Sequence, residues 1–146
     1  MFSKRFYLSW IISALLMFIL SYAWHGIFLT DLSRLNYPKE LFLIFAAFVY
    51  LIIGFVITKV TDFKMFHKHF KRKPIIRGLL AGLGCGFALF LISNVVGVSF
   101  STGSRLENLL LDFVWQLIEQ GIGGLSIGII RFLVFEPSTD FEDEQA

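Results

Sequence analysis

The sequence is poor in charge, cysteine and proline. Only 16% of its 146 residues are Asp, Glu, Lys or Arg, and it contains one cysteine and three prolines. The lone Cys85 excludes an intramolecular disulfide, and a soluble domain would carry charge on about 25% of its residues. The chain also lacks a nucleophile-elbow, Walker or zincin motif. We therefore expect no resident cofactor, and we do not predict an enzyme.

Hydrophobic residues instead dominate the chain, at 56% of the total, with eighteen phenylalanines. Four apolar segments approach the roughly 20 residues that a helix needs to cross a bilayer. They span residues 6–29, 41–58, 75–98 and 108–135. The first follows Lys4 and Arg5 as a signal peptide would, but its apolar run continues to Leu29, so we interpret it as a membrane helix. The sequence predicts an all-α, polytopic membrane protein with four transmembrane helices in one domain, residues 1–136.

The distribution of positive charge predicts the orientation of these helices. Ten of the 13 lysines and arginines belong to the N-terminus, to the region 59–77 or to the end of the last helix, at Arg131. Arg34, Lys39 and Arg105 belong to the opposite side. Because cytoplasmic loops are enriched in Lys and Arg, both termini are expected in the cytoplasm, with the protein in a bacterial inner membrane. The same bias disfavours insertion in two opposite orientations.

The loop 59–74 mixes cations with phenylalanines, which is typical of a segment that lies in the membrane interface. We expect its cations to bind anionic lipid headgroups. They are Lys64, Lys68, Lys71, Arg72 and Lys73. Binding to nucleic acid is disfavoured because contact with the membrane already accounts for the charge. The tail, residues 137–146, is acidic and predicted to be disordered.

Small residues recur at helical spacing in the last two segments. The third carries a small-xxx-small ladder, and the fourth carries a second glycine stripe on the side away from Glu119. The glycines are Gly78, Gly82 and Gly86, then Gly121, Gly124 and Gly128. Because glycine lets two helix backbones approach closely, both stripes predict packing against another helix or a partner subunit.

Polar residues in the last segment suggest a site. Carboxylates within a membrane span are usually functional, and Glu119 lies near the midplane with no Lys or Arg at its depth. We expect it to be protonated at neutral pH, or hydrogen-bonded to Gln116, Ser93 or Tyr22. Side chains nearer the outer surface would complete an outward-facing polar pocket. These candidates are His25, Tyr22, Asn94, Asp112, Trp115 and Gln116.

The sequence does not decide between two functions for this pocket. A metal ion shared by His25, Asp112 and Glu119 is disfavoured, because Glu119 would lie about 10 Å deeper than Asp112. The favoured function is the binding or conduction of a small solute or protons. The alternative is a non-catalytic subunit whose glycine faces and buried polar groups dock into a larger membrane complex, or a homo-oligomer.

Short motifs also resemble those of known proteins. The residues Tyr22-Ala-Trp-His-Gly26, Ser93-Asn94 and Asp112-Phe-Val-Trp115 resemble motifs of small four-helix bacterial membrane proteins of unknown function, the DUF1761 and DUF2177 groups. That resemblance implies a fold and no activity. Small multidrug resistance transporters are similar in architecture, but their essential Glu is in the first helix, which here has none.

Overall fold

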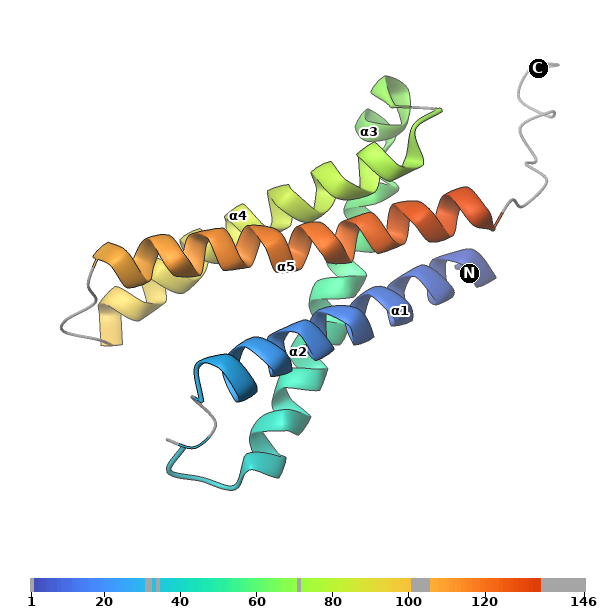
Figure 1. Ribbon diagram of the computed structural model, residues 1–146. Coiled ribbons are helices and arrows are strands. Elements are labelled where there is room, and N and C mark those ends of the chain that lie inside the picture. The colour runs from blue at the N-terminus through green and yellow to red at the C-terminus, as the bar shows by residue number, and fades with distance from the viewer. Residues whose placement is uncertain (1, 31–32, 34, 71, 101–105, 135–146) are drawn as a thin grey trace, which may run out of the picture.

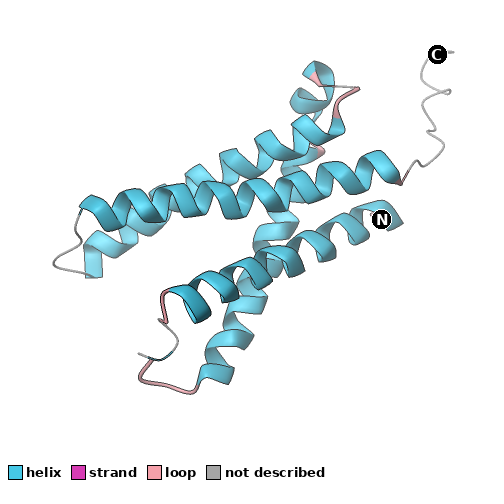
Figure 2. Ribbon diagram, viewed as in Figure 1, coloured by secondary structure: helices cyan, strands magenta, loops and turns pink. Residues whose placement is uncertain are grey.

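All elements that the structure describes are helices. The computed structural model describes residues 2–30, 33, 35–70, 72–100 and 106–134 (Figures 1 and 2). The helices are α1 (Lys4–Ser21), the π-helix η1 (Tyr22–Phe28), α2 (Lys39–Thr61), α3 (Lys64–His69), α4 (Pro74–Phe100) and α5 (Leu106–Leu133). Four stretches are long and apolar enough to cross a membrane: Lys4–Phe28, Lys39–Thr61, Pro74–Val96 and Glu107–Leu133. The prediction of an all-α protein with four membrane-length helices is confirmed. Arg34, Lys71, Arg105 and the predicted tail lie outside the described residues.

The first membrane stretch joins two kinds of helix. Ser3 caps α1, since its hydroxyl accepts a hydrogen bond from the Phe6 amide at 3.2 Å. After Ser21 the helix widens into η1, and the Leu29 amide donates to the Trp24 carbonyl five residues earlier, at 2.9 Å. This widening has no signature in the sequence. Such π-helical turns are frequent at functional sites.

The second membrane helix is longer than its apolar run. It was predicted over residues 41–58, but α2 begins after Pro38 and ends at Thr61. The hydroxyls of Thr58 and Thr61 donate to carbonyls one turn earlier, Gly54 and Ile57, so these polar residues are satisfied within the helix. The short α3 then lies within the predicted basic loop.

The helices form a bundle in which α4 and α5 pack along their length and α1 lies against both α5 and α2 (Figure 1). In that view α2 crosses the other long helices steeply. Contacts between Arg5 and Arg131, and between Arg131 and Asp62, bring together the start of α1, the end of α2 and the end of α5. We call this the arginine end of the bundle.

Close approach of α4 to α5 depends on glycine. A Cβ atom at Gly82 would meet the backbone of Gln120 and Gly124, and one at Gly86 would lie 2.8 Å from the Gln116 carbonyl oxygen. Backbone therefore packs directly on backbone along this pair, which replaces the hydrophobic driving force that is missing between helices in lipid.

Candidate functional site

Glu119 is the buried carboxyl group at the centre of the bundle. It lies halfway along α5, and its exposed fraction is 1%. The indole Nε1 of Trp115, one turn earlier, donates to Oε2 at 2.8 Å, and Nε2 of Gln120 donates to Oε1 at 3.2 Å. Among the described residues, no lysine or arginine pairs with it. Both of these hydrogen-bond donors are neutral, so neither balances the charge of a buried carboxylate.

A third contact comes from α2. The phenol of Tyr50 is within side-chain hydrogen-bonding reach of both Glu119 and Ser21. Since a tyrosine hydroxyl both donates and accepts, Tyr50 can connect the carboxyl group on α5 with the hydroxyl at the end of α1. Three helices therefore contribute to this centre.

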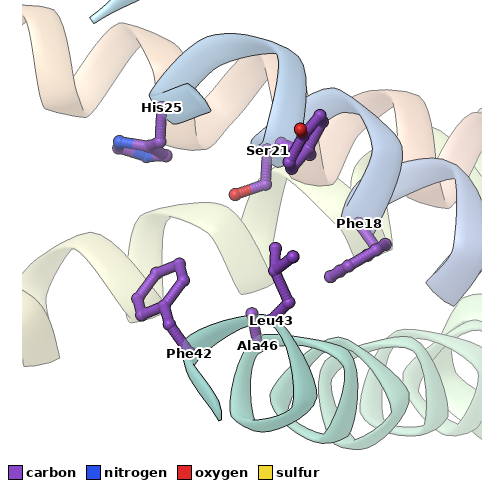
Figure 3. A pocket seen from close by; sticks show the side chains of 7 residues that line it. Phe18, Ser21, His25, Phe42, Leu43 and Ala46 are labelled. Carbon is purple, nitrogen blue, oxygen red and sulfur yellow. The ribbon is translucent and has the colours of Figure 1, made fainter. Parts of the chain in front are cut away.

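A small cavity opens beside Ser21, between the end of α1 and α2. Figure 3 shows the Ser21 hydroxyl and the His25 ring at one wall, with Phe42 and Leu43 facing them from α2. The cavity measures about 10 Å³. That volume is about what one water molecule occupies. His25 is also close enough to Glu119 to attract its carboxylate electrostatically.

An aromatic stack lies beside Glu119. The rings of Trp24 in η1 and Trp115 in α5 are parallel within 8°, with centroids 4.3 Å apart. The wide turn of η1 thus presents Trp24 to α5, while Trp115 donates its N–H to Glu119. The stack shields the carboxyl group and fixes the orientation of one of its donors.

Toward the arginine end, the centre is closed by an apolar cluster. The cluster comprises Met17, Ile57, Ala81 and Ile127, each at most 1% exposed, with Tyr50 packed against it. We call these four residues the apolar plug. The plug lies along the helices between Glu119 and the arginine end, beside the buried hydroxyls of Ser13 and Thr58.

The predicted pocket residues are distributed over three environments. His25 and Tyr22 line the cavity, and Tyr22 is 46% exposed. Asp112 is exposed on α5, away from Glu119. Asn94 donates to the Phe90 carbonyl of its own helix at 2.9 Å. Of the outer candidates, His25 and Tyr22 therefore line the cavity, and Trp115 contacts the buried centre.

The partners expected for Glu119 differ from those in the structure. Gln116 has a buried Oε1 without a hydrogen-bond partner among the described residues, and Ser93 is exposed. Instead Trp115 and Gln120 donate to Glu119, and the Tyr50 phenol lies close to it. Tyr50 was not predicted from the sequence, because it is a single polar residue in an almost uniformly apolar helix, where packing is its ordinary role.

The glycine stripes of α4 and α5 pack against each other or against side chains of the other helix. Gly78 and Gly82 meet Gly124, and Gly128 meets Ile75 at the start of α4. Gly121 contacts the side chains of Leu79 and Leu83, also in α4. Within the described chain, the partner of both stripes is therefore the other helix of the α4–α5 pair.

The cations predicted to meet lipid headgroups are exposed where described. These are Lys64, Lys68, Arg72 and Lys73. Within the described part of the chain, no three His, Cys, Asp or Glu side chains come close enough to hold a metal ion.

Comparison of the chain with protein-family models, with curated proteins and with solved structures gives no match. Any function must therefore be argued from the chemistry of the residues themselves.

Proposed function

We propose that this protein is a multi-pass membrane protein that binds a proton at Glu119, taken up from the end of the bundle opposite the arginine end. With both termini in the cytoplasm of a bacterial cell, that end faces outward. The proton enters at the cavity beside His25 and Ser21, passes through Tyr50 and stops at Glu119. The apolar plug blocks passage toward the arginine end in this conformation.

The proposal depends on the proximity of the Tyr50 phenol to both Ser21 and Glu119. A hydroxyl that accepts one hydrogen bond and donates another transfers a proton without moving its oxygen. Ser21 lies on the cavity wall, so one water molecule there completes the path to the outer end. Tyr50 is the step that this path requires.

The size of the cavity favours a proton over a solute. A ligand pocket for a small organic molecule measures about 300–1,000 Å³, whereas this cavity measures about 10 Å³. Water and protons are the species that fit it. A conducting pore for a larger solute would require the helices to separate.

The electrostatics of Glu119 favour the bound proton. A carboxylate is costly to bury, and Trp115 and Gln120 contribute only neutral donors, although His25 lies near enough to attract the charge. Protonation removes that cost. We therefore expect Glu119 to carry a proton at neutral pH and to release it when the bundle rearranges.

Infrared difference spectroscopy of the protein in liposomes tests the proposal. The band of a protonated carboxyl group should be present at pH 7 in the wild-type protein and absent in Glu119→Gln. Glu107→Gln is the matched control, since Glu107 is an exposed carboxyl group on the same helix, and it should retain the band. A wild-type spectrum without that band would refute proton binding at Glu119.

A second candidate is a subunit of a larger membrane complex, which the exposure of Asp112 favours. Asp112 is exposed within the candidate span Glu107–Leu133. Because lipid solvates a carboxylate poorly, a polar group of a partner or of a second copy would cover it. Cross-linking from Asp112→Cys in native membranes should then give a defined adduct. A protein that remains monomeric under those conditions would exclude this role.

A further inference from the structure

Three arginines meet at the arginine end of the bundle, each from a different helix. Arg5 belongs to α1, Arg77 to α4 and Arg131 to α5. Nη2 of Arg5 donates to the carbonyl oxygen of Arg131 at 2.7 Å, and Arg5 is close enough to repel both other guanidinium groups. Arg77 and Arg131 are only 3% and 7% exposed. We call these three residues the arginine cluster.

The charge of the arginine cluster is not balanced by the described residues. Asp62 makes a bidentate ion pair with Arg131, with Nη2 and Oδ2 2.7 Å apart. Arg77 instead donates from Nη1 to Nδ1 of His67 at 2.6 Å, which requires a lone pair on that nitrogen and leaves the proton on Nε2. Three guanidinium groups thus share one described carboxylate. A buried guanidinium group without an ionic partner is costly, so a further anion would stabilise the cluster.

Donors in the cluster also lack acceptors. The Nε atoms of Arg5, Arg77 and Arg131 are all buried, and none has a hydrogen-bond partner among the described residues. An unsatisfied buried donor costs about 1–3 kcal/mol, more where it is charged. Guanidinium edges match the oxygens of a phosphate group, which accepts two hydrogen bonds from one arginine.

A surface groove lies beside Asp62, the ionic partner of Arg131. It has a volume of about 420 Å³ and is lined by Lys59, Asp62, Phe63 and Lys64. Nζ of Lys59 lies 4.3 Å from the centroid of the Phe2 ring, which holds the ammonium group beside the start of α1. The two lysines make the groove attractive to an anion, while Asp62 connects it to Arg131.

We propose that the arginine cluster binds a phosphate group, which enters through the groove between Lys59 and Lys64. The phosphate belongs either to the headgroup of an anionic phospholipid or to a free anion. Apart from Lys64 at the groove, this site differs from the exposed cations of the predicted basic loop, because its guanidinium groups converge from three helices and two of them, Arg77 and Arg131, are buried. It is also separated from Glu119 by the apolar plug, so it does not depend on the proposed proton site.

Binding to the full-length protein in nanodiscs tests the site, with two probes. One is phosphatidylglycerol, measured by its retention after exchange into phosphatidylcholine; the other is inorganic phosphate, measured by calorimetry. We expect Arg77→Gln to weaken binding of the recognised probe roughly tenfold, the loss expected for one charge-assisted contact. Lys4→Gln, which removes an exposed charge at the same end of the bundle, should leave binding unchanged.

The two probes distinguish the sources of the phosphate. Retention of phosphatidylglycerol that depends on Arg77 assigns the site to lipid, and calorimetric binding that depends on Arg77 assigns it to the free anion. If Arg77→Gln does not fold, Arg5→Gln provides the same comparison at the half-buried edge of the cluster. Equal binding by wild type, Arg77→Gln and Lys4→Gln, or no binding of either probe, would overturn the proposal.

Discussion

The indole N–H of Trp115 donates to the carboxyl group of Glu119 across one turn of α5, at 2.8 Å, while its ring stacks on Trp24. One side chain thereby couples the π-helical end of the first membrane stretch to the buried acid. Both contacts are needed for this coupling: the stack on Trp24 orients the Trp115 ring, and the hydrogen bond from that ring orients the Glu119 carboxyl group.

Trp115→Phe should keep the aromatic contact and remove the N–H donor. We expect the C=O band of protonated Glu119 to shift to higher wavenumber, because the carboxyl group loses a hydrogen bond, and stability to fall by about 1 kcal/mol. Trp10→Phe is the control, since Trp10 donates to the Leu51 carbonyl and not to Glu119. An unchanged band in Trp115→Phe would show that the indole does not act on Glu119 in the membrane.

Tyr50→Phe should interrupt the path between Ser21 and Glu119 while preserving the packing of the ring against the apolar plug. Proton exchange at Glu119 after a pH jump, followed by time-resolved infrared spectroscopy, is expected to slow roughly 10²-fold, the lower end of the contribution of a positioned proton-transfer group. Tyr37→Phe, at an exposed residue before α2, serves as the reference. Equal exchange rates in the two variants would remove Tyr50 from the path.

Gly82→Ala should destabilise the α4–α5 pair, because the added methyl group would meet the Gln120 backbone, which has no flexible end to move aside. We expect a loss of about 1–3 kcal/mol, measured by unfolding in mixed micelles. Gly84→Ala makes the same chemical change two residues later, where nothing lies within 4 Å of the new atom, and should cost less than about 0.5 kcal/mol. Similar losses at both positions would contradict backbone contact at Gly82.

Asp62→Asn should leave Arg131 buried without its ionic partner. Because the Asp62 side chain is 38% exposed and water screens part of the pair, the expected loss of stability is about 1–3 kcal/mol, below that of a fully buried pair. Glu40→Gln, an exposed carboxyl group at the other end of α2, provides the comparison in the same unfolding assay. A loss no larger than that of Glu40→Gln would mean that the ion pair contributes little.

The sequence predicted the class of fold because helix length and hydropathy are local properties. The stripe of Gly78, Gly82 and Gly86 likewise indicated a close-packing face from spacing alone. It did not indicate the partner, since periodicity describes one helix at a time and cannot say which helix will lie opposite.

The candidate site was harder to predict for the same reason. Glu119 stands out on its own helix, but Tyr50 reaches it from α2 and Trp24 approaches through a π-helical turn that no sequence signal marks. The expected partners Gln116 and Ser93 were chosen by depth, and they differ from the observed ones because rotation about each helix axis decides contact. The arginine cluster was counted only as evidence of orientation, although its members come together in space.

The apolar plug has an electrical consequence for the buried acid. A proton that enters from the opposite end and stops at Glu119, halfway along α5, has crossed about half of the membrane's electric field. Moving a full elementary charge across 100 mV changes its free energy by about 2.3 kcal/mol, so occupancy of Glu119 would respond to voltage by about 1 kcal/mol per 100 mV. The proton occupancy of Glu119, which is accessible from one side only, would then depend on the membrane potential as well as on the external pH.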